Sequence, residues 1–272
     1  MPTQADKAAV FQQLHRGPSA FLLANAWDAG SARVLSGLGY AALASSSGAS
    51  AAVLGKRDGQ VSRDEALAQV AAIVAATNLP VSADLERGFG DAPELVAETI
   101  RMAAEAGVVG GSIEDASGDP ENPLYDFPLA VERVAAAAEA ARKLPFPFTL
   151  TARTENYLRG RPDLEDTIRR LRAFADAGAD VLFAPGLPDL AAVRAVCGAV
   201  HKPISFMAGI PGRSFSVAEL EAAGVRRISV AASFYRAALT GLVEAAKEVR
   251  DKGTFSYVER AISGQELNGF FP

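Results

Sequence analysis

Residues 79–90 read LPVSADLERGFG, and residues 106–115 read AGVVGGSIED. Each stretch contains a short run of small and β-branched residues, the pattern of a buried strand, and each run ends in carboxylates. Pro80 precedes the first run and Gly107 precedes the second. Proline ends a helix because it has no N–H to donate, whereas glycine ends one by adopting a left-handed conformation. The two stretches therefore predict two parallel strands joined by a helix.

The same two signals alternate along the chain. A proline precedes every odd-numbered predicted strand, and a small-residue–glycine turn precedes every even-numbered one. Four such cycles predict an α/β fold, a TIM-type (β/α)8 barrel over residues 1–250, with a C-terminal helical extension over residues 251–272. A doubly wound open sheet is the alternative, because periodicity does not show closure. The predicted strands are Phe21–Ala24, Ala41–Ser45, Val81–Asp84, Val109–Glu114, Thr149–Ala152, Val181–Phe183, Ile204–Met207 and Arg227–Val230.

Three helix starts carry a capping-box pattern, in which an oxygen-bearing side chain stands three residues before a glutamate. They are Ser62 to Glu65, Asp91 to Glu94 and Ser216 to Glu219. Each pattern predicts that a helix begins directly after its first residue.

Composition excludes several classes of protein. The chain has 272 residues, is 49% hydrophobic and carries a net charge of −5, which predicts a large core and no binding of nucleic acid. A single cysteine, Cys197, excludes an internal disulfide framework and fits the cytoplasm. No apolar run approaches the roughly 18 residues of a membrane span, so no membrane contact is expected.

Carboxylates gather where the third, fourth and fifth predicted strands end. In a barrel these ends meet at the face that carries function. Hard oxygen ligands from several strands favour Mg²⁺, with Mn²⁺ as a second choice. The alternative is that the carboxylates form ion pairs with Arg87, Arg153 and Arg159. The carboxylates are Asp84, Glu86, Glu114 and Glu155, with Asp115 beside Glu114.

Other chemistry is not expected. His15 and His201 fall at the opposite end of the barrel from the carboxylates, and no lysine lies in a strand, which excludes a Schiff-base aldolase. Cys197 stands near the end of a helix, where it is expected to pack in the core. The loop Ala116–Asp126 follows Glu114-Asp115 and is rich in Gly, Pro, Asp and Asn. We expect it to be a lid over the site, with a plain surface loop as the alternative.

In this order, these residues resemble the isocitrate lyase/phosphoenolpyruvate mutase superfamily over nearly the whole barrel. The members have a Ser-Gly dipeptide after strand two, here Ser47-Gly48, and an aspartate in the next loop, here Asp58. Their Asp-x-Asp metal motif with a Gly-aromatic-Gly turn is similar to residues 84–90, DLERGFG. Ile113–Asp115 matches the end of strand four, and Ala152–Glu155 is close to the Ala-Arg-Thr-Asp of strand five.

The resemblance implies Mg²⁺ held by Asp84, Glu86 and Glu114, largely through water. It implies a small 2-oxo carboxylate as substrate, similar to oxaloacetate, 2-oxoglutarate or pyruvate, and a homotetramer or dimer in which the tail contacts a neighbour. Arg153 would stabilise the enolate that develops beside the metal. The further residues that we expect to contact substrate or act in catalysis are Trp27, Ser47, Gly48, Ala49, Asp58, Asn122 and Ser205.

The sequence departs from the superfamily pattern in three places. Glu86 replaces an aspartate, the end of strand six (Phe183–Gly186) lacks the Glu or His of relatives, and the lid has no Cys, Lys or His. Isocitrate and methylisocitrate lyases move a proton with a lid cysteine, so neither activity is expected. The leading hypothesis is a Mg²⁺-dependent lyase cleaving a C–C bond, oxaloacetate decarboxylase-like or dimethylmalate lyase-like. The alternatives are C–P chemistry on phosphonopyruvate and a 2-oxo acid-binding protein with little turnover.

Overall fold

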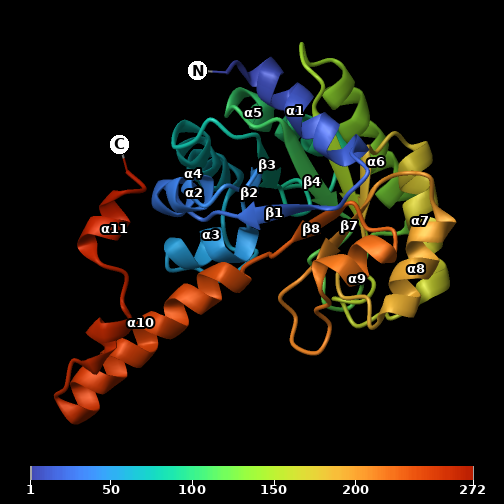
Figure 1. Ribbon diagram of the computed structural model, residues 1–272. Helices are drawn as coiled ribbons and strands as arrows, with labels where there is room; N and C mark the ends of the chain where they lie inside the picture. Colours follow the sequence, from blue (N-terminus) through green and yellow to red (C-terminus); the bar gives the residue numbers. More distant parts are fainter. Residues whose placement is uncertain (1, 272) are drawn as a thin grey trace.

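Eight parallel strands pair in chain order and close into a barrel in a computed structural model that describes residues 2–271 (Figure 1). Pairing of β1 with β8, Phe21 opposite Arg227, closes the ring. The (β/α)8 prediction is therefore confirmed, and the open-sheet alternative is wrong. The strands are β1 (Phe21–Asn25), β2 (Leu43–Ala44), β3 (Val81–Asp84), β4 (Gly110–Glu114), β5 (Thr149–Arg153), β6 (Val181–Phe183), β7 (Ile204–Met207) and β8 (Arg227–Ser229).

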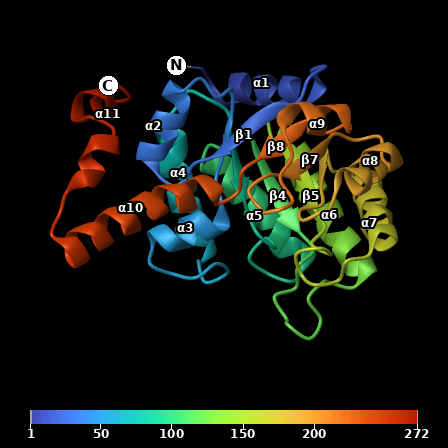
Figure 2. The ribbon, with the colours of Figure 1, turned by 60° about the horizontal axis from the view of Figure 1, so that its bottom comes forward.

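Helices surround the barrel and follow its strands (Figures 1 and 2). The turns that lead from helix to strand have the predicted glycine conformation. Gly39, Gly107, Gly178 and Gly224 all have positive φ, between 86° and 108°. The helices are α1 (Gln4–Arg16), α2 (Ala29–Gly37), α3 (Ser47–Val53), α4 (Arg63–Ala75), α5 (Pro93–Glu105), α6 (Phe127–Arg142), α7 (Leu164–Asp176), α8 (Leu190–Ala199), α9 (Val217–Ala222), α10 (Ser233–Lys252), the 3-10 helix η1 (Ser256–Arg260) and α11 (Gly264–Asn268).

Two of the three predicted capping boxes form. Ser62 and Ser216 accept from the backbone N–H three residues on and cap α4 and α9. The prediction for Asp91 is wrong, because Pro93 takes the first position of α5 and makes Ala92 the N-cap. The Asp91 carboxylate instead accepts a hydrogen bond from the Tyr125 hydroxyl at 2.5 Å.

The amino-terminal end of the barrel is filled by α1. Phe11 is fully buried and packs edge-on against His15 and Phe21. Gly110 makes this approach possible, since a Cβ there would lie 2.9 Å from the Phe11 ring and 2.8 Å from the Thr149 carbonyl oxygen. We call this apolar end the floor of the barrel and the carboxyl-terminal end its mouth.

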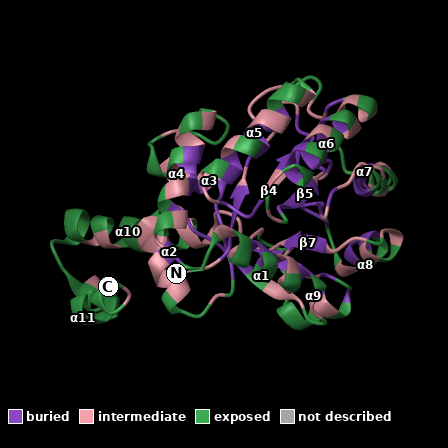
Figure 3. Cartoon of the chain, turned by 90° about the horizontal axis from the view of Figure 1, so that it is seen from above, coloured by how far each residue is buried: buried purple, intermediate pink, exposed green. Residues whose placement is uncertain are grey.

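The chain leaves the barrel at α10, none of whose residues 233–252 is buried (Figure 3). The boundary expected at residue 250 falls inside this helix. The segment after α10 turns back until Phe270 packs on Gly37 of α2. Leu242 of α10 is exposed, and so are Phe255 and Val258 in the tail that follows it. Within residues 2–271, every helix is too short or too polar to span a bilayer.

Candidate active site

The end of β3 turns sharply and places Asp84 and Glu86 at the mouth. Glu86 has φ +49°, a left-handed conformation that is uncommon for a residue with a side chain. Asp84 Oδ1 accepts from the Glu86 backbone N–H at 3.3 Å, and Asp84 Oδ2 accepts from the Ser47 N–H at 3.0 Å. A Cβ at Gly48 would lie 3.4 Å from the Asp58 carboxylate. The structure thus brings together the predicted Ser-Gly dipeptide, Asp58 and the metal motif.

Arg153, at the end of β5, lies among three carboxylates. Its Nη1 is 3.4 Å from Glu114 Oε2 and 4.0 Å from Asp84 Oδ1, and its Nε donates to Glu155 Oε1. Arg159 adds a second cation, with Nη2 3.2 Å from Glu114 Oε1. Arg153 and Arg159 therefore form the ion pairs that the alternative expected with these carboxylates. These pairs join the ends of β3, β4 and β5 into one charged cluster.

Arg87 behaves differently from these two arginines. Its Nη1 donates to the Ser117 carbonyl in the lid and lies 3.8 Å from Asp91, outside the carboxylate cluster. The cluster opens on a cavity of about 370 Å³, here called the mouth pocket. Its lining residues are Ser47, Asp58, Gly59, Glu86, Arg87, Glu114, Ala116, Gly118, Arg153 and Arg159.

Negative charge in the mouth pocket is only partly compensated. Within residues 2–271, no Lys, Arg or His nitrogen lies within 4.0 Å of the Glu86 carboxylate. Burial, followed by the charges of Asp84 and Asp58, raises the pKa of Glu86 to about 7. Burial also raises the pKa of Glu114, against the opposing effect of Arg153. Carboxyls that hold protons this tightly in a cluster of oxygens are suited to exchange them for a divalent cation.

The side-chain atoms of the mouth-pocket lining that could ligate a metal are oxygens, a hard type of ligand. The site therefore fits Mg²⁺ better than a softer metal. Among residues 2–271, no three His, Cys, Asp or Glu side chains are close enough to enclose a metal by themselves. Mg²⁺ commonly takes one or two protein carboxylates and completes its octahedron with water and substrate.

The remaining predicted residues, Trp27, Ser205 and Asn122, make contacts with residues other than those of this cluster. Trp27 packs edge-on against Tyr235 of α10, with ring centroids 5.4 Å apart. Ser205 is buried on β7, where its Oγ accepts from Arg227. Asn122 is exposed on the lid, donates to Asp119 Oδ2, and lines a neighbouring cavity of about 850 Å³ instead of the mouth pocket.

The side chains excluded from catalysis are placed as expected. His15 is buried on the floor and His201 is exposed. Cys197 is half-buried in α8, where burial raises the pKa of its thiol to about 11.

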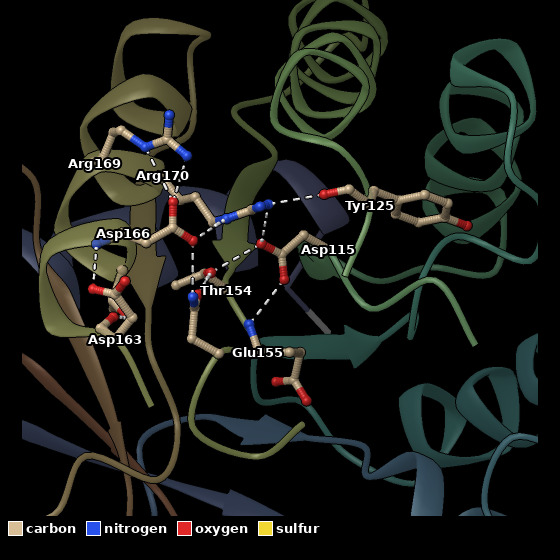
Figure 4. A network of polar contacts seen from close by, with 10 residues as sticks. Asp115, Tyr125, Thr154, Glu155, Asp163, Asp166, Arg169 and Arg170 are labelled. Carbon is tan, nitrogen blue, oxygen red and sulfur yellow. Dashed lines mark hydrogen bonds and ion pairs between the residues drawn. The ribbon is translucent and has the colours of Figure 1, made fainter. Parts of the chain in front are cut away.

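A buried polar network behind the mouth escaped the sequence analysis (Figure 4). Asp115, next to Glu114, accepts from the Glu155 N–H at 2.8 Å and from Thr154 Oγ1 at 2.9 Å. Arg170 of α7 donates to Asp115 at 3.2 Å and to the Tyr125 carbonyl at 3.1 Å. The network ties the ends of β4 and β5 to the base of the lid. The sequence signal that could have predicted the network is the position of Arg170. It stands next to Leu171 and four residues before Phe174, on the apolar and therefore buried face of α7.

Comparison with known proteins gives a consistent result. A family model described as phosphoenolpyruvate phosphomutase matches residues 11–250. The oxaloacetate decarboxylase of Paraburkholderia xenovorans (strain LB400) is 34% identical over 244 residues, which cover 86% of this chain and 79% of the relative.

Two crystal structures extend the similarity to nearly the full chain. A candidate lyase/mutase from Burkholderia cenocepacia J2315 is 53% identical, with a TM-score of 0.96 and coverage of 98% of this chain and 96% of the other. The structure of 2,3-dimethylmalate lyase, a PEP mutase/isocitrate lyase superfamily member, is 27% identical, with a TM-score of 0.87 and coverage of 99% and 95%.

Proposed function

The chain belongs to the phosphoenolpyruvate phosphomutase family, within the isocitrate lyase/phosphoenolpyruvate mutase superfamily, and from this premise we propose that it is a Mg²⁺-dependent C–C lyase. Its substrate is a small 2-oxo or 2-hydroxy dicarboxylic acid, cleaved through an enolate. The observation that carries this proposal is the cluster of Asp84, Glu114 and Glu155 around Arg153, beside Glu86, whose carboxylate forms no ion pair within residues 2–271.

The metal would be held by Asp84, Glu86 and Glu114, with Mn²⁺ as a possible substitute for Mg²⁺. When bound, the ion supplies a Lewis acid that polarises the carbonyl oxygen of the substrate. The ring of Asp84, Glu114 and Glu155 fixes the Arg153 guanidinium in place before substrate arrives. A cation fixed in this way stabilises the negative oxygen that develops during bond cleavage, with little reorganisation.

The first turn of α3 would receive the substrate carboxylate through the backbone of Ser47, Gly48 and Ala49. Asp58 lies over Gly48 and borders the mouth pocket, where it would contact the substrate from the solvent side. Trp27 and Ser205 are proposed as further substrate contacts. Asn122 would have to leave Asp119 to reach the mouth, so its role requires the lid to close.

The lid favours chemistry that needs no strong proton donor. Residues 116–126 contain no Cys, Lys or His. Decarboxylation of an oxaloacetate-like acid needs an electron sink and no catalytic cysteine, and the relative from Paraburkholderia xenovorans is named as an oxaloacetate decarboxylase. Cleavage of a 2,3-dimethylmalate-like acid is the second reaction of this class, in keeping with the structural similarity to that lyase.

The exposed apolar side chains of the tail support an assembly of several copies. We propose a homotetramer or dimer, in the cytoplasm, in which residues 251–272 contact a neighbouring subunit. Light scattering of the purified protein and of a form ending at residue 250 tests this. The full chain is expected to have the mass of a tetramer or dimer and the shortened form that of a monomer. An equal number of subunits in both would contradict the proposal.

Turnover of oxaloacetate, 2,3-dimethylmalate and phosphonopyruvate with Mg²⁺ tests the proposed reaction. We expect C–C products from one of the first two acids. Phosphate released from phosphonopyruvate would instead assign C–P chemistry. Saturable Mg²⁺-dependent binding of 2-oxoglutarate or pyruvate without products would make the protein a 2-oxo acid binder.

Metal dependence is tested separately by thermal unfolding. Mg²⁺ is expected to raise the melting temperature of the wild type and of Asp176→Ala, an exposed control at the end of α7. The shift should vanish in Asp84→Ala. An equal shift in Asp84→Ala would reject Asp84 as a ligand.

A further inference from the structure

Arg227 begins β8 and points into the barrel, where only 4% of its surface is exposed. Its Nε donates to Ser205 Oγ on β7, and its Nη1 donates to Thr151 Oγ1 on β5, both at 3.0 Å. Thr151 stands two residues before Arg153 on the same strand, so both side chains face the barrel interior. The Arg227 guanidinium therefore lies on the inner side of Arg153, toward the floor.

Arg227 forms no ion pair within the part of the chain that the structure describes. Among residues 2–271, no carboxylate oxygen lies within 4.0 Å of Arg227, and both of its side-chain partners are neutral hydroxyls. Burial alone lowers the pKa of Arg227 to about 9. His15 on the floor is neutral, since burial and the charge of Arg227 lower its pKa to about 3. A buried cation without a nearby anion is energetically unfavourable, so binding of an anion beside Arg227 would stabilise it.

A small cavity of about 50 Å³ lies beside Arg227. Arg153 and Asp84 also line it, so it adjoins the mouth pocket that Arg153 borders. A water molecule occupies roughly 30 Å³ in the liquid, which makes the cavity large enough for a group of the size of a carboxylate. Its other lining residues mix polar side chains, namely Asn25, Ser45, Ser82, Ser112 and Ser229, with apolar ones such as Leu23, Phe183 and Met207.

We propose that Arg227, held by Ser205 and Thr151, is the subsite for the second carboxylate of the di-acid substrate. A four- or five-carbon acid bound at Arg153 can reach it, because Arg153 borders both spaces. The guanidinium then gains the counter-ion that the protein does not supply, through charge-assisted hydrogen bonds. This inference rests on the proposed function and specifies its substrate class.

The contact also restricts which bond breaks. A carboxylate paired with a guanidinium is stabilised in its charged form, whereas decarboxylation removes that charge. The group held by Arg227 is therefore a spectator, and cleavage occurs elsewhere in the molecule. Within the two C–C reactions proposed above, the subsite favours an acid that keeps both carboxylates during cleavage, as a dimethylmalate-like substrate does.

Calorimetry with Mg²⁺ and a matched pair of ligands tests the subsite. 2-Oxoglutarate carries the second carboxylate and 2-oxobutanoate lacks it. We expect the wild type to prefer the di-acid by about 10- to 100-fold, the range of one charge-assisted contact. Arg227→Met should reduce this preference to about twofold while binding 2-oxobutanoate as before. A di-acid preference that persists in Arg227→Met would overturn the inference.

Arg226→Met is the matched control, because the neighbouring arginine points out of the barrel and donates to the Pro18 carbonyl. It should keep the di-acid preference. Arg227→Lys, which retains the charge, should keep part of it. Melting curves first establish that each variant folds, and Met is an apolar side chain of similar length that spares the cost of a buried charge.

Failure of the proposed function is separable from failure of this subsite. If the wild type binds neither 2-oxo acid and turns over neither oxaloacetate nor 2,3-dimethylmalate, the proposed function falls, and sodium formate then serves as the probe of a lone carboxylate. Formate should raise the melting temperature of the wild type and of Arg226→Met more than that of Arg227→Met at equal ionic strength. Equal shifts in all three proteins would overturn the subsite as well.

Discussion

Arg153 and Arg227 share one barrel interior but have opposite electrostatic surroundings. Arg153, at the mouth, is enclosed by Asp84, Glu114 and Glu155, whereas the side-chain partners of Arg227 within residues 2–271 are the hydroxyls of Ser205 and Thr151. Arg227 is buried and the Arg153 side chain is only 14% exposed, so solvent screens both charges weakly. The protein supplies the counter-charge of the first arginine, and a ligand must supply that of the second.

The difference separates two tasks. A cation whose position is fixed by the protein's own carboxylates is ready to stabilise charge that appears during a reaction. A cation without a carboxylate gains most when an anion arrives, so it contributes to binding and to selection between ligands. Substitutions at the mouth should therefore affect turnover most, and those toward the floor should affect stability or ligand choice.

The largest effect is expected from Arg153→Met. Loss of the fixed cation should lower kcat about 10²- to 10³-fold, as removal of one oxyanion donor does. Three carboxylates lose their common partner, so stability should also fall, by about 3–5 kcal/mol. Steady-state kinetics and urea unfolding measure the two effects. Arg101→Met, which breaks an exposed pair with Glu98, is the control, and turnover above a tenth of wild type in Arg153→Met would refute the assignment.

Phe11→Ala tests the floor, where the reverse pattern is expected. The ring is fully buried between α1 and the barrel, so its loss should cost about 3–5 kcal/mol of stability with kcat unchanged under folding conditions. Urea unfolding checks this against Val10→Ala, whose side chain is 50% exposed. A loss in Phe11→Ala as small as that in Val10→Ala would show that α1 does not close the barrel.

His15, on the floor, should make the free energy of unfolding depend on pH. Its pKa is about 3 when folded, because burial and then the charge of Arg227 oppose protonation, against 6.5 for the free side chain. The unfolded chain thus binds a proton that the folded chain does not, and stability present above pH 6.5 is lost as the pH falls toward 3. Between pH 7 and 5 this amounts to about 2 kcal/mol.

His15→Leu should remove that part of the acid sensitivity, and the exposed control His201→Leu should keep it. Urea unfolding at pH 7 and pH 5 provides the comparison. Arg227→Met should also weaken the dependence, since it removes one of the two causes of the shift. Identical pH profiles for His15→Leu and the wild type would contradict the coupling of His15 to the floor.

The barrel was predictable because its signals are local. A proline or a glycine decides the end of a helix through its own backbone, as the positive φ of Gly107 and Gly178 shows. The residues at the mouth followed from the same strand ends, since parallel strands in a barrel present their last residues on one face. The capping prediction for Asp91 failed where a neighbouring residue, Pro93, shifted the start of the helix by one position.

The charge pairing was not predictable, because it depends on contacts between distant segments. Arg226 and Arg227 are adjacent in the sequence and look alike there, but the alternation of strand side chains sends one outward and the other inward. Arg170 reaches Asp115 across 55 positions of the chain. The sequence also does not show that Glu86 adopts a left-handed conformation.

The smallest effect on stability is expected at the lid. Asn122 is exposed, and its side chain donates to the neighbouring Asp119, so Asn122→Ala should change stability by no more than about 0.5 kcal/mol. If the lid closes over the mouth and brings Asn122 to the substrate, kcat should fall by about tenfold or more. Asp119→Ala is the control: it breaks the same hydrogen bond and frees Asn122, so it should leave kcat nearly unchanged. Equal kcat in the wild type, Asn122→Ala and Asp119→Ala would show that residues 116–126 are a surface loop without a role in catalysis. Arg153 and the carboxylates of the mouth would then remain as the candidate catalytic groups.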